Sequence, residues 1–138
     1  MTNYSQITIE AVISRPLSEV WSRFTQPEHI TQWNFASDDW QCPRASNDLK
    51  VGGKYSARME AKDGSFGFDL VGIYSEVVDQ KKLAYTMEDG RKVTTKFEKI
   101  GDSTKVTTKF DAEKQNSEEL QKSGWQAILN NFKKYAER

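Results

Sequence analysis

Two residues have side chains suited to nucleophilic or metal chemistry, Cys42 and His29, and each is the only one of its type in 138 residues. A catalytic Cys42 would need an activating base, and His29 is the only imidazole available. Structural zinc sites use four ligands rich in Cys and His, so this pair predicts none. We therefore expect Cys42 to be an unpaired structural thiol and His29 to be a polar residue on a short helix. We expect neither a metal nor a cofactor.

A Gly-Gly-Lys triplet at residues 52–54 has the residue types of a phosphate-binding loop. A P-loop needs Gly, four residues and then Gly-Lys-Ser/Thr between a strand and a helix. Here the lysine precedes a strand pattern, and Tyr55 takes the position of the Ser or Thr. The triplet is therefore predicted to be a turn.

The acidic residues fall into two groups that allow different chemistry. Asp63, Asp89 and Asp102 lie in predicted turns, where hydrogen bonding to the backbone in solvent is the ordinary role. A carboxylate on a strand could instead point inward, where burial raises its pKa and suits it to general acid–base catalysis. An enzymatic function therefore stays open, and its candidate acids are Glu60, Asp69 and Glu76.

The composition excludes several classes of partner. Twenty basic residues balance twenty acidic ones, and the pI is about 6.6, so we expect no nucleic acid partner. No apolar stretch approaches the roughly 20 residues of a membrane-spanning helix. The first six residues have neither a basic start nor an apolar run, which predicts no signal peptide. With a single cysteine, a reducing cytoplasmic location is expected.

These residues must be positioned by the elements that the periodicity predicts. Alternating apolar and polar residues, separated by Gly-containing turns such as Asp-Gly at 63–64, indicate consecutive hairpins. Strands joined by such short turns are antiparallel. A short strand is expected around Trp40 in an otherwise irregular stretch at residues 34–50. The longer strands are expected at residues 7–13, 55–60, 66–78, 83–87, 93–97 and 106–110.

Three helices are predicted. Pro16 ends the first strand, and an apolar stripe at helical spacing follows it. Thr25 and Glu28 have the spacing of a capping box for a second short helix through Trp33. A helix of about 20 residues begins near Ser117, about 30 Å long. The layout predicts a single α+β domain over residues 1–138, in which a curved antiparallel sheet wraps around the C-terminal helix.

Gly124 lies inside the predicted long helix, where glycine costs about 1 kcal/mol relative to alanine. Either close approach to a strand or empty volume for a ligand would offset that cost. We interpret Trp21 and Trp125 as core residues, since both lie in amphipathic helical patterns. An inward set rich in aromatic residues and methionine then favours an apolar cavity under the helix. Its candidate ligand-binding residues are Trp33, Trp40, Met59, Phe66, Phe68, Tyr85, Met87, Phe97, Gly124 and Ile128.

The order of elements and several short motifs resemble the START-related (SRPBCC, helix-grip) superfamily, in its activator of heat-shock-protein ATPase homologue branch. The resemblance covers nearly the whole chain. One departure is that Asn34 and Phe35 stand where the family usually has a second tryptophan. The motifs are Pro16 with Val20-Trp21, Pro27-Glu28 with Gln32-Trp33, Gly52-Gly53-Lys54-Tyr55, Gly72 with Tyr74, Glu76 and Val77, Leu83 with Tyr85-Thr86, and Gly124-Trp125.

The resemblance implies a helix-grip fold and leaves three kinds of function open. The first is a module that binds a small apolar ligand, such as a lipid or an aromatic compound. The second is an enzyme of the cyclase, lyase or hydrolase kind, with an acid or base in the cavity. The third is a protein module that assists a chaperone ATPase through its surface.

Overall fold

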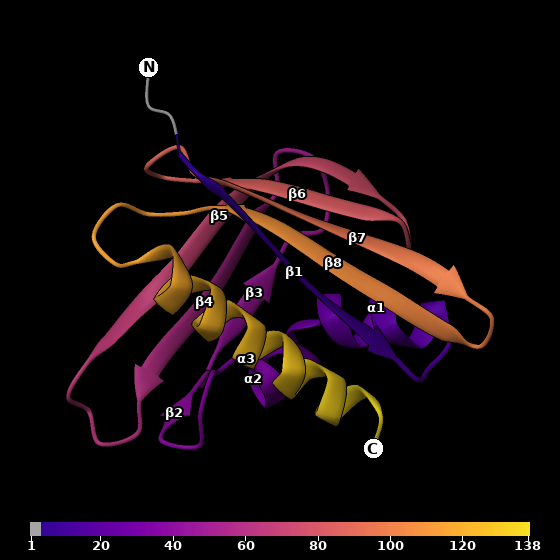
Figure 1. Cartoon of the computed structure of the whole chain (residues 1–138), viewed down its shortest axis with the longest axis horizontal. Coiled ribbons are helices and arrows are strands. Elements are labelled where there is room, and N and C mark those ends of the chain that lie inside the picture. Colours follow the sequence, from indigo (N-terminus) through magenta and orange to yellow (C-terminus); the bar gives the residue numbers. More distant parts are fainter. Residues whose placement is uncertain (1–3) are drawn as a thin grey trace.

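Within residues 4–138, which this computed structural model describes, eight strands form one antiparallel sheet that curls around a C-terminal helix (Figure 1). The first three residues, part of the segment expected to carry no signal peptide, lie outside the described residues. The elements are β1 (Gln6–Ile13), α1 (Leu17–Thr25), α2 (Pro27–Trp33), β2 (Trp40–Gln41), β3 (Ala45–Asn47), β4 (Lys54–Ala61), β5 (Gly67–Val78), β6 (Lys82–Met87), β7 (Lys92–Ile100), β8 (Ser103–Asp111) and α3 (Glu118–Ala136).

The sheet is the predicted meander, closed by the first strand. Its order is β1-β8-β7-β6-β5-β4-β2, and β3 also pairs with β4. The turns carry the expected glycines, with Gly64 and Gly90 at φ +79° and +91°, a region that favours glycine. The predicted role of the turn aspartates is confirmed for Asp63 and Asp89. Their Oδ1 atoms accept hydrogen bonds from the backbone two residues later, at 2.8 and 3.1 Å.

The two short helices follow the first strand as predicted, but the proposed capping box is wrong. Thr25 is the last residue of α1, and its hydroxyl donates to the carbonyl oxygen of Trp21 at 2.7 Å. That hydroxyl is therefore committed to the preceding helix. Gln26 is the N-cap of α2 instead, without a side-chain capping hydrogen bond.

The C-terminal helix α3 begins where the sequence indicates and lies across the open side of the curled sheet (Figure 1). Its N-cap Ser117 accepts a hydrogen bond from the backbone N–H of Leu120 at 3.0 Å. Leu129, Phe132 and Ala136 are buried on its inner face. The Phe132 ring packs edge-on against Phe24 of α1 and Trp33 of α2. These contacts fill one end of the space between helix and sheet.

The stretch expected to be irregular contains more structure than predicted. Trp40 lies on the short strand β2, as expected. The strand β3 was not predicted, because three residues are too few to show a period. Its last residue, Asn47, accepts a hydrogen bond from the Tyr74 hydroxyl at 2.7 Å. This strand therefore contributes a polar side chain to the interior.

Candidate functional site

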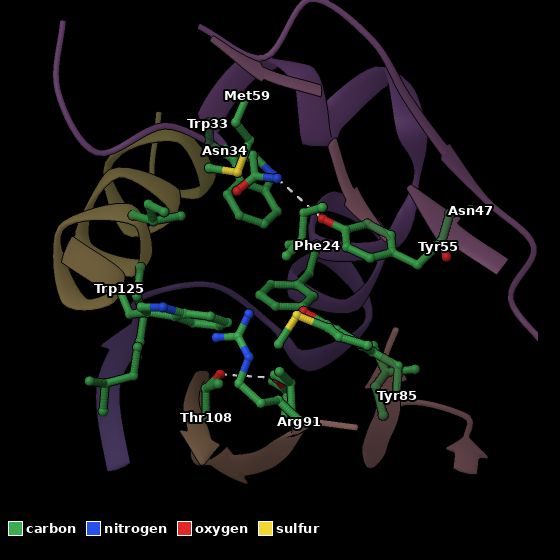
Figure 2. Close-up of a pocket in the computed structure, with 18 of the residues that line it drawn as sticks. Phe24, Trp33, Asn34, Asn47, Tyr55, Met59, Tyr85, Arg91, Thr108 and Trp125 are labelled. Carbon is green, nitrogen blue, oxygen red and sulfur yellow. Dashed lines mark hydrogen bonds between the residues drawn. The ribbon is translucent and has the colours of Figure 1, made fainter. Parts of the chain in front are cut away.

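A pocket of about 290 Å³ lies between the concave face of the sheet and the helices α2 and α3 (Figure 2). Its walls are formed mainly by aromatic and aliphatic side chains from β4 to β7 and from α3. The end filled by Phe132 is solid, so the pocket occupies the other part of the concave face. Side chains from distant segments meet there, with Trp33 and Asn34 on the upper side of Figure 2, Trp125 on the left and Tyr85 on the lower right.

Three tyrosines make one wall of this pocket. The Tyr85 ring lies 5.5 Å from Tyr55 and 6.1 Å from Tyr74, measured between centroids. A Cβ at Gly72 would lie 2.2 Å from Cδ1 of Tyr85, so the absence of a side chain at Gly72 leaves room for the Tyr85 ring. Burial raises the pKa of Tyr74 to about 12 and the pKa of Tyr55 and Tyr85 well above the ordinary 10.0. All three hydroxyls are therefore protonated at neutral pH.

Two asparagines line the upper part of the pocket in Figure 2. Asn34 is buried and donates from Nδ2 to the Tyr55 hydroxyl at 3.1 Å. Asn47 donates to the carbonyl oxygen of Thr25 at 2.7 Å while accepting from Tyr74. Asn34 belongs to the Asn34-Phe35 pair that departs from the motif of the resembling family.

A buried threonine pair lies on the sheet floor. The hydroxyls of Thr95 on β7 and Thr108 on β8 are 3.0 Å apart. Both residues line the pocket, where each hydroxyl provides the hydrogen-bond partner that the other needs.

Arg91 also lines the pocket, although its position between the strands expected at residues 83–87 and 93–97 predicts a residue of a turn. The Arg91 carbonyl oxygen accepts a hydrogen bond from the Met87 N–H at 2.8 Å, so the two residues face each other across the hairpin. Directly opposed residues project from the same face of a sheet. Met87 was expected to point inward, and the hairpin register would have predicted the same for Arg91.

Six of the ten candidate ligand-binding residues line the pocket. They come from α2, the three strands β4, β5 and β6, and α3. For the four residues on strands, the alternation of apolar and polar residues identified the concave face. Those six are Trp33, Met59, Phe68, Tyr85, Met87 and Ile128.

The other four candidates do not line it. Phe66 precedes β5 and is 61% exposed, with its ring 6.0 Å from Trp40, which lies on the edge strand β2. Phe97 does face inward, but α1 covers this part of the sheet and Trp21 packs on the ring at 5.1 Å. Around Gly124 a Cβ would meet no heavy atom within 4 Å, so no strand approaches it.

The two tryptophans interpreted as core differ in the structure. Trp21 is buried in the core, as predicted. Trp125 is only partly buried and lines the pocket, with its ring stacked on Phe110 at 4.1 Å. The helical pattern identified its face correctly but could not show that this part of the interior is hollow.

The strand carboxylates proposed as acids are engaged away from the pocket. Glu60 pairs with Arg58 at 3.1 Å, and Asp69 lies 3.7 Å from the same arginine. Hydrogen bonds from Arg58 and Gln41 hold the pKa of Glu60 below its ordinary value. Glu76 pairs with Lys82 at 3.0 Å. The pocket lining among the described residues contains none of these three carboxylates.

Cys42 and His29 are not partners. Cys42 is buried, and burial raises the pKa of its thiol to about 11. Nδ1 of His29 lies 2.6 Å from the Tyr135 hydroxyl. In the part of the chain that the structure describes, no group of three His, Cys, Asp or Glu residues could hold a metal ion. None of the helices within residues 4–138 is long and apolar enough to cross a membrane.

Comparison with known proteins identifies relatives over almost the entire chain. A family model described as Activator of Hsp90 ATPase homolog 1-like protein matches residues 14–137. The structure is similar to an AHSA1-like protein from Aeromonas hydrophila, with 41% identity, coverage of 96% of this chain and 92% of that chain, and a TM-score of 0.90. A protein from Cytophaga hutchinsonii is 46% identical with the same coverage and a TM-score of 0.83. No curated protein sequence matches the chain.

Proposed function

Because the chain belongs to the Activator of Hsp90 ATPase homolog 1-like protein family, a family of helix-grip modules, we propose that it binds a small, largely apolar molecule between the curved sheet and α3. The observation that carries this proposal is the pocket itself. Its volume of about 290 Å³ lies just below the roughly 300–1,000 Å³ common for ligand sites, which suits a small ligand. Apolar walls with a few placed polar groups are typical of such sites.

The chemistry of the lining supports binding over catalysis. Among the described residues its polar side-chain groups are amides, hydroxyls, indole N–H groups and one guanidinium. A general acid or base works best with a pKa near the operating pH, whereas the pKa of each pocket tyrosine is raised far above neutrality. These groups are suited to orienting a ligand by hydrogen bonds rather than to transferring protons.

We also propose that residues 1–138 act as one domain and that the protein works in the cytoplasm. All eight strands belong to one sheet, in which β1 from the start of the sequence pairs with β8 near its end. Cys42 is a free buried thiol, which suits a reducing compartment.

The test is a titration with N-phenyl-1-naphthylamine, an uncharged dye that fluoresces in apolar surroundings. Ile128→Trp places a larger side chain in the pocket wall and should weaken dye binding about tenfold or more, since overpacking opposes insertion. Ile100→Trp adds the same side chain at a position that is 48% exposed and should leave dye affinity unchanged. Native mass spectrometry of freshly purified protein should reveal a bound small molecule. Equal dye affinity in all three proteins would refute the proposal.

A chaperone-assisting role is the second candidate, because the family description names an activator of an ATPase. It would act through the protein surface. It predicts association with a chaperone ATPase at micromolar concentration that Ile128→Trp does not change.

A further inference from the structure

Arg91 places a positive charge in the pocket wall, and its ion-pair partner Asp89 lies outside the lining. It is the only Arg or Lys lining the pocket in the described part of the chain, and no Asp or Glu there lines it. Figure 2 shows its guanidinium extending from the lower wall toward the interior, beside the Trp125 ring. The side chain is 20% exposed, so it is mostly withdrawn from bulk solvent. A cation in such a position attracts an anionic group.

Only the Nε edge of the Arg91 guanidinium is hydrogen-bonded to a described residue. Its Nε donates to Oδ2 of Asp89 at 2.7 Å, and the backbone N–H of Arg91 donates to Oδ1 of the same residue. The opposed Met87 fixes the backbone from the other strand. The terminal nitrogens Nη1 and Nη2 make no hydrogen bond to any described residue. Four of the five N–H donors of an arginine are therefore available to a ligand.

A second donor lies close to this group. Tyr85 and Arg91 both line the pocket, and Figure 2 shows the two side chains extending from its lower side toward the same interior space. The Tyr85 hydroxyl stays protonated and can donate a hydrogen bond. A planar carboxylate accepts two parallel bonds from a guanidinium and has a further lone pair for a hydroxyl.

Resting on the proposed binding function, we infer that the pocket selects amphipathic monocarboxylates, molecules with one carboxylate on an apolar body. The carboxylate binds the terminal nitrogens of Arg91 and the Tyr85 hydroxyl. The apolar body lies along Trp125 toward Met59 and Phe68. The alternative role for Arg91 is an ion pair with Asp89 at the surface. Such a pair would not explain why the guanidinium extends into the pocket, because exposed pairs contribute little stability and form without contact to a pocket.

The test compares two ligands that share an apolar chain and differ in charge. Decanoate and decan-1-ol each displace the uncharged dye from wild-type protein at pH 7.5, and the decanoate titration is repeated by calorimetry without dye. Decanoate should bind wild-type protein more tightly than the alcohol. In Arg91→Gln its affinity should fall about tenfold to a hundredfold, the range expected for charged hydrogen bonds. Dye and decan-1-ol affinities should stay within about twofold, because their contacts are apolar.

Two further variants sharpen the result. Arg91→Lys keeps the charge but cannot bind a carboxylate with two parallel bonds, so it should give an intermediate decanoate affinity. Lys92→Gln removes an exposed cation next in sequence that does not line the pocket, and it should change nothing. Equal binding of decanoate and decan-1-ol, or equal losses for both ligands in Arg91→Gln, would overturn this inference while leaving the binding function intact. If wild-type protein binds neither dye nor either decyl compound, the binding function fails and this inference fails with it.

Discussion

Gly124→Ala should stabilise the protein, because the structure leaves room for the added methyl group. A Cβ at this position would meet no heavy atom within 4 Å. Glycine in a helix interior is about 0.8–1.0 kcal/mol less favourable than alanine. The substitution removes no contact and creates no clash, so nearly all of that difference should appear in the free energy of unfolding. A gain of this size corresponds to a rise in Tm of roughly 3–6 °C in a domain of intermediate length.

Urea unfolding followed by circular dichroism measures this gain. With m near 1–3 kcal/mol per molar urea, the midpoint should rise by about 0.3–1 M at unchanged m. Gly72→Ala is the matched control of opposite sign, because its Cβ would lie 2.2 Å from Cδ1 of Tyr85. It should cost about 1–3 kcal/mol by overpacking. Dye affinity should not change in Gly124→Ala, since this residue does not line the pocket. A loss of stability in Gly124→Ala would show that something packs against the glycine and would refute the reasoning.

Three further predictions concern stability. Trp125→Ala should lower the free energy of unfolding, measured with urea, by about 2–3 kcal/mol. The expected loss is smaller than for a fully buried tryptophan, because the Trp125 ring stacks on Phe110 on one side and borders the pocket on the other. A loss under about 1 kcal/mol would contradict the stacking. Thr95→Val and Thr108→Val should each cost about 1–2 kcal/mol by leaving one hydroxyl unpaired, and the double variant should cost less than their sum. Additive losses would argue against the pair. Burial raises the pKa of the Cys42 thiol from the ordinary 9.0 to about 11 in the folded protein. Between these pH values the unfolded chain loses the thiol proton while the folded chain keeps it. The free energy of unfolding should therefore fall by up to about 1.4 kcal/mol per pH unit in this range. Cys42→Ala should flatten this fall, and an identical pH profile in that variant would exclude the thiol as its cause.

The fold followed from sequence periodicity because most elements are long enough to repeat a pattern. Along β8, Thr104, Val106, Thr108 and Phe110 are buried while the residues between them are more exposed. The same alternation set the inner faces of β4 and β7. The strand β3 has only three residues and shows no such pattern. The Thr25 cap failed because two helices meet there, and local spacing cannot decide which one uses the hydroxyl.

The pocket could be predicted from the sequence less completely than the fold. Alternation of apolar and polar residues assigns each side chain to a face of the sheet but does not show which helix covers each part of that face. Phe97 and Tyr85 both face inward, yet α1 packs on the first and leaves the second beside the pocket. For the same reason the helical pattern placed Trp125 in the core, although this side chain lines the pocket. Arg91 required the register of the hairpin, which places it opposite Met87 and turns a residue of a polar turn toward the interior.

The pairing of β1 with β8 has a consequence for how the chain folds during synthesis. Gln6 pairs with Asp111, 105 residues later in the sequence. At a synthesis rate of about 5–20 residues per second, β1 waits roughly 5–20 s before its partner exists. During that time Ile7, Ile9 and Ile13, all buried in the finished sheet, have no strand to cover them. The meander from β4 to β8 consists of local hairpins that close quickly, whereas contacts between distant segments form slowly. Docking of β1 is therefore expected to be a late step, and the nascent N-terminal strand is the segment most exposed to wrong pairing with other chains.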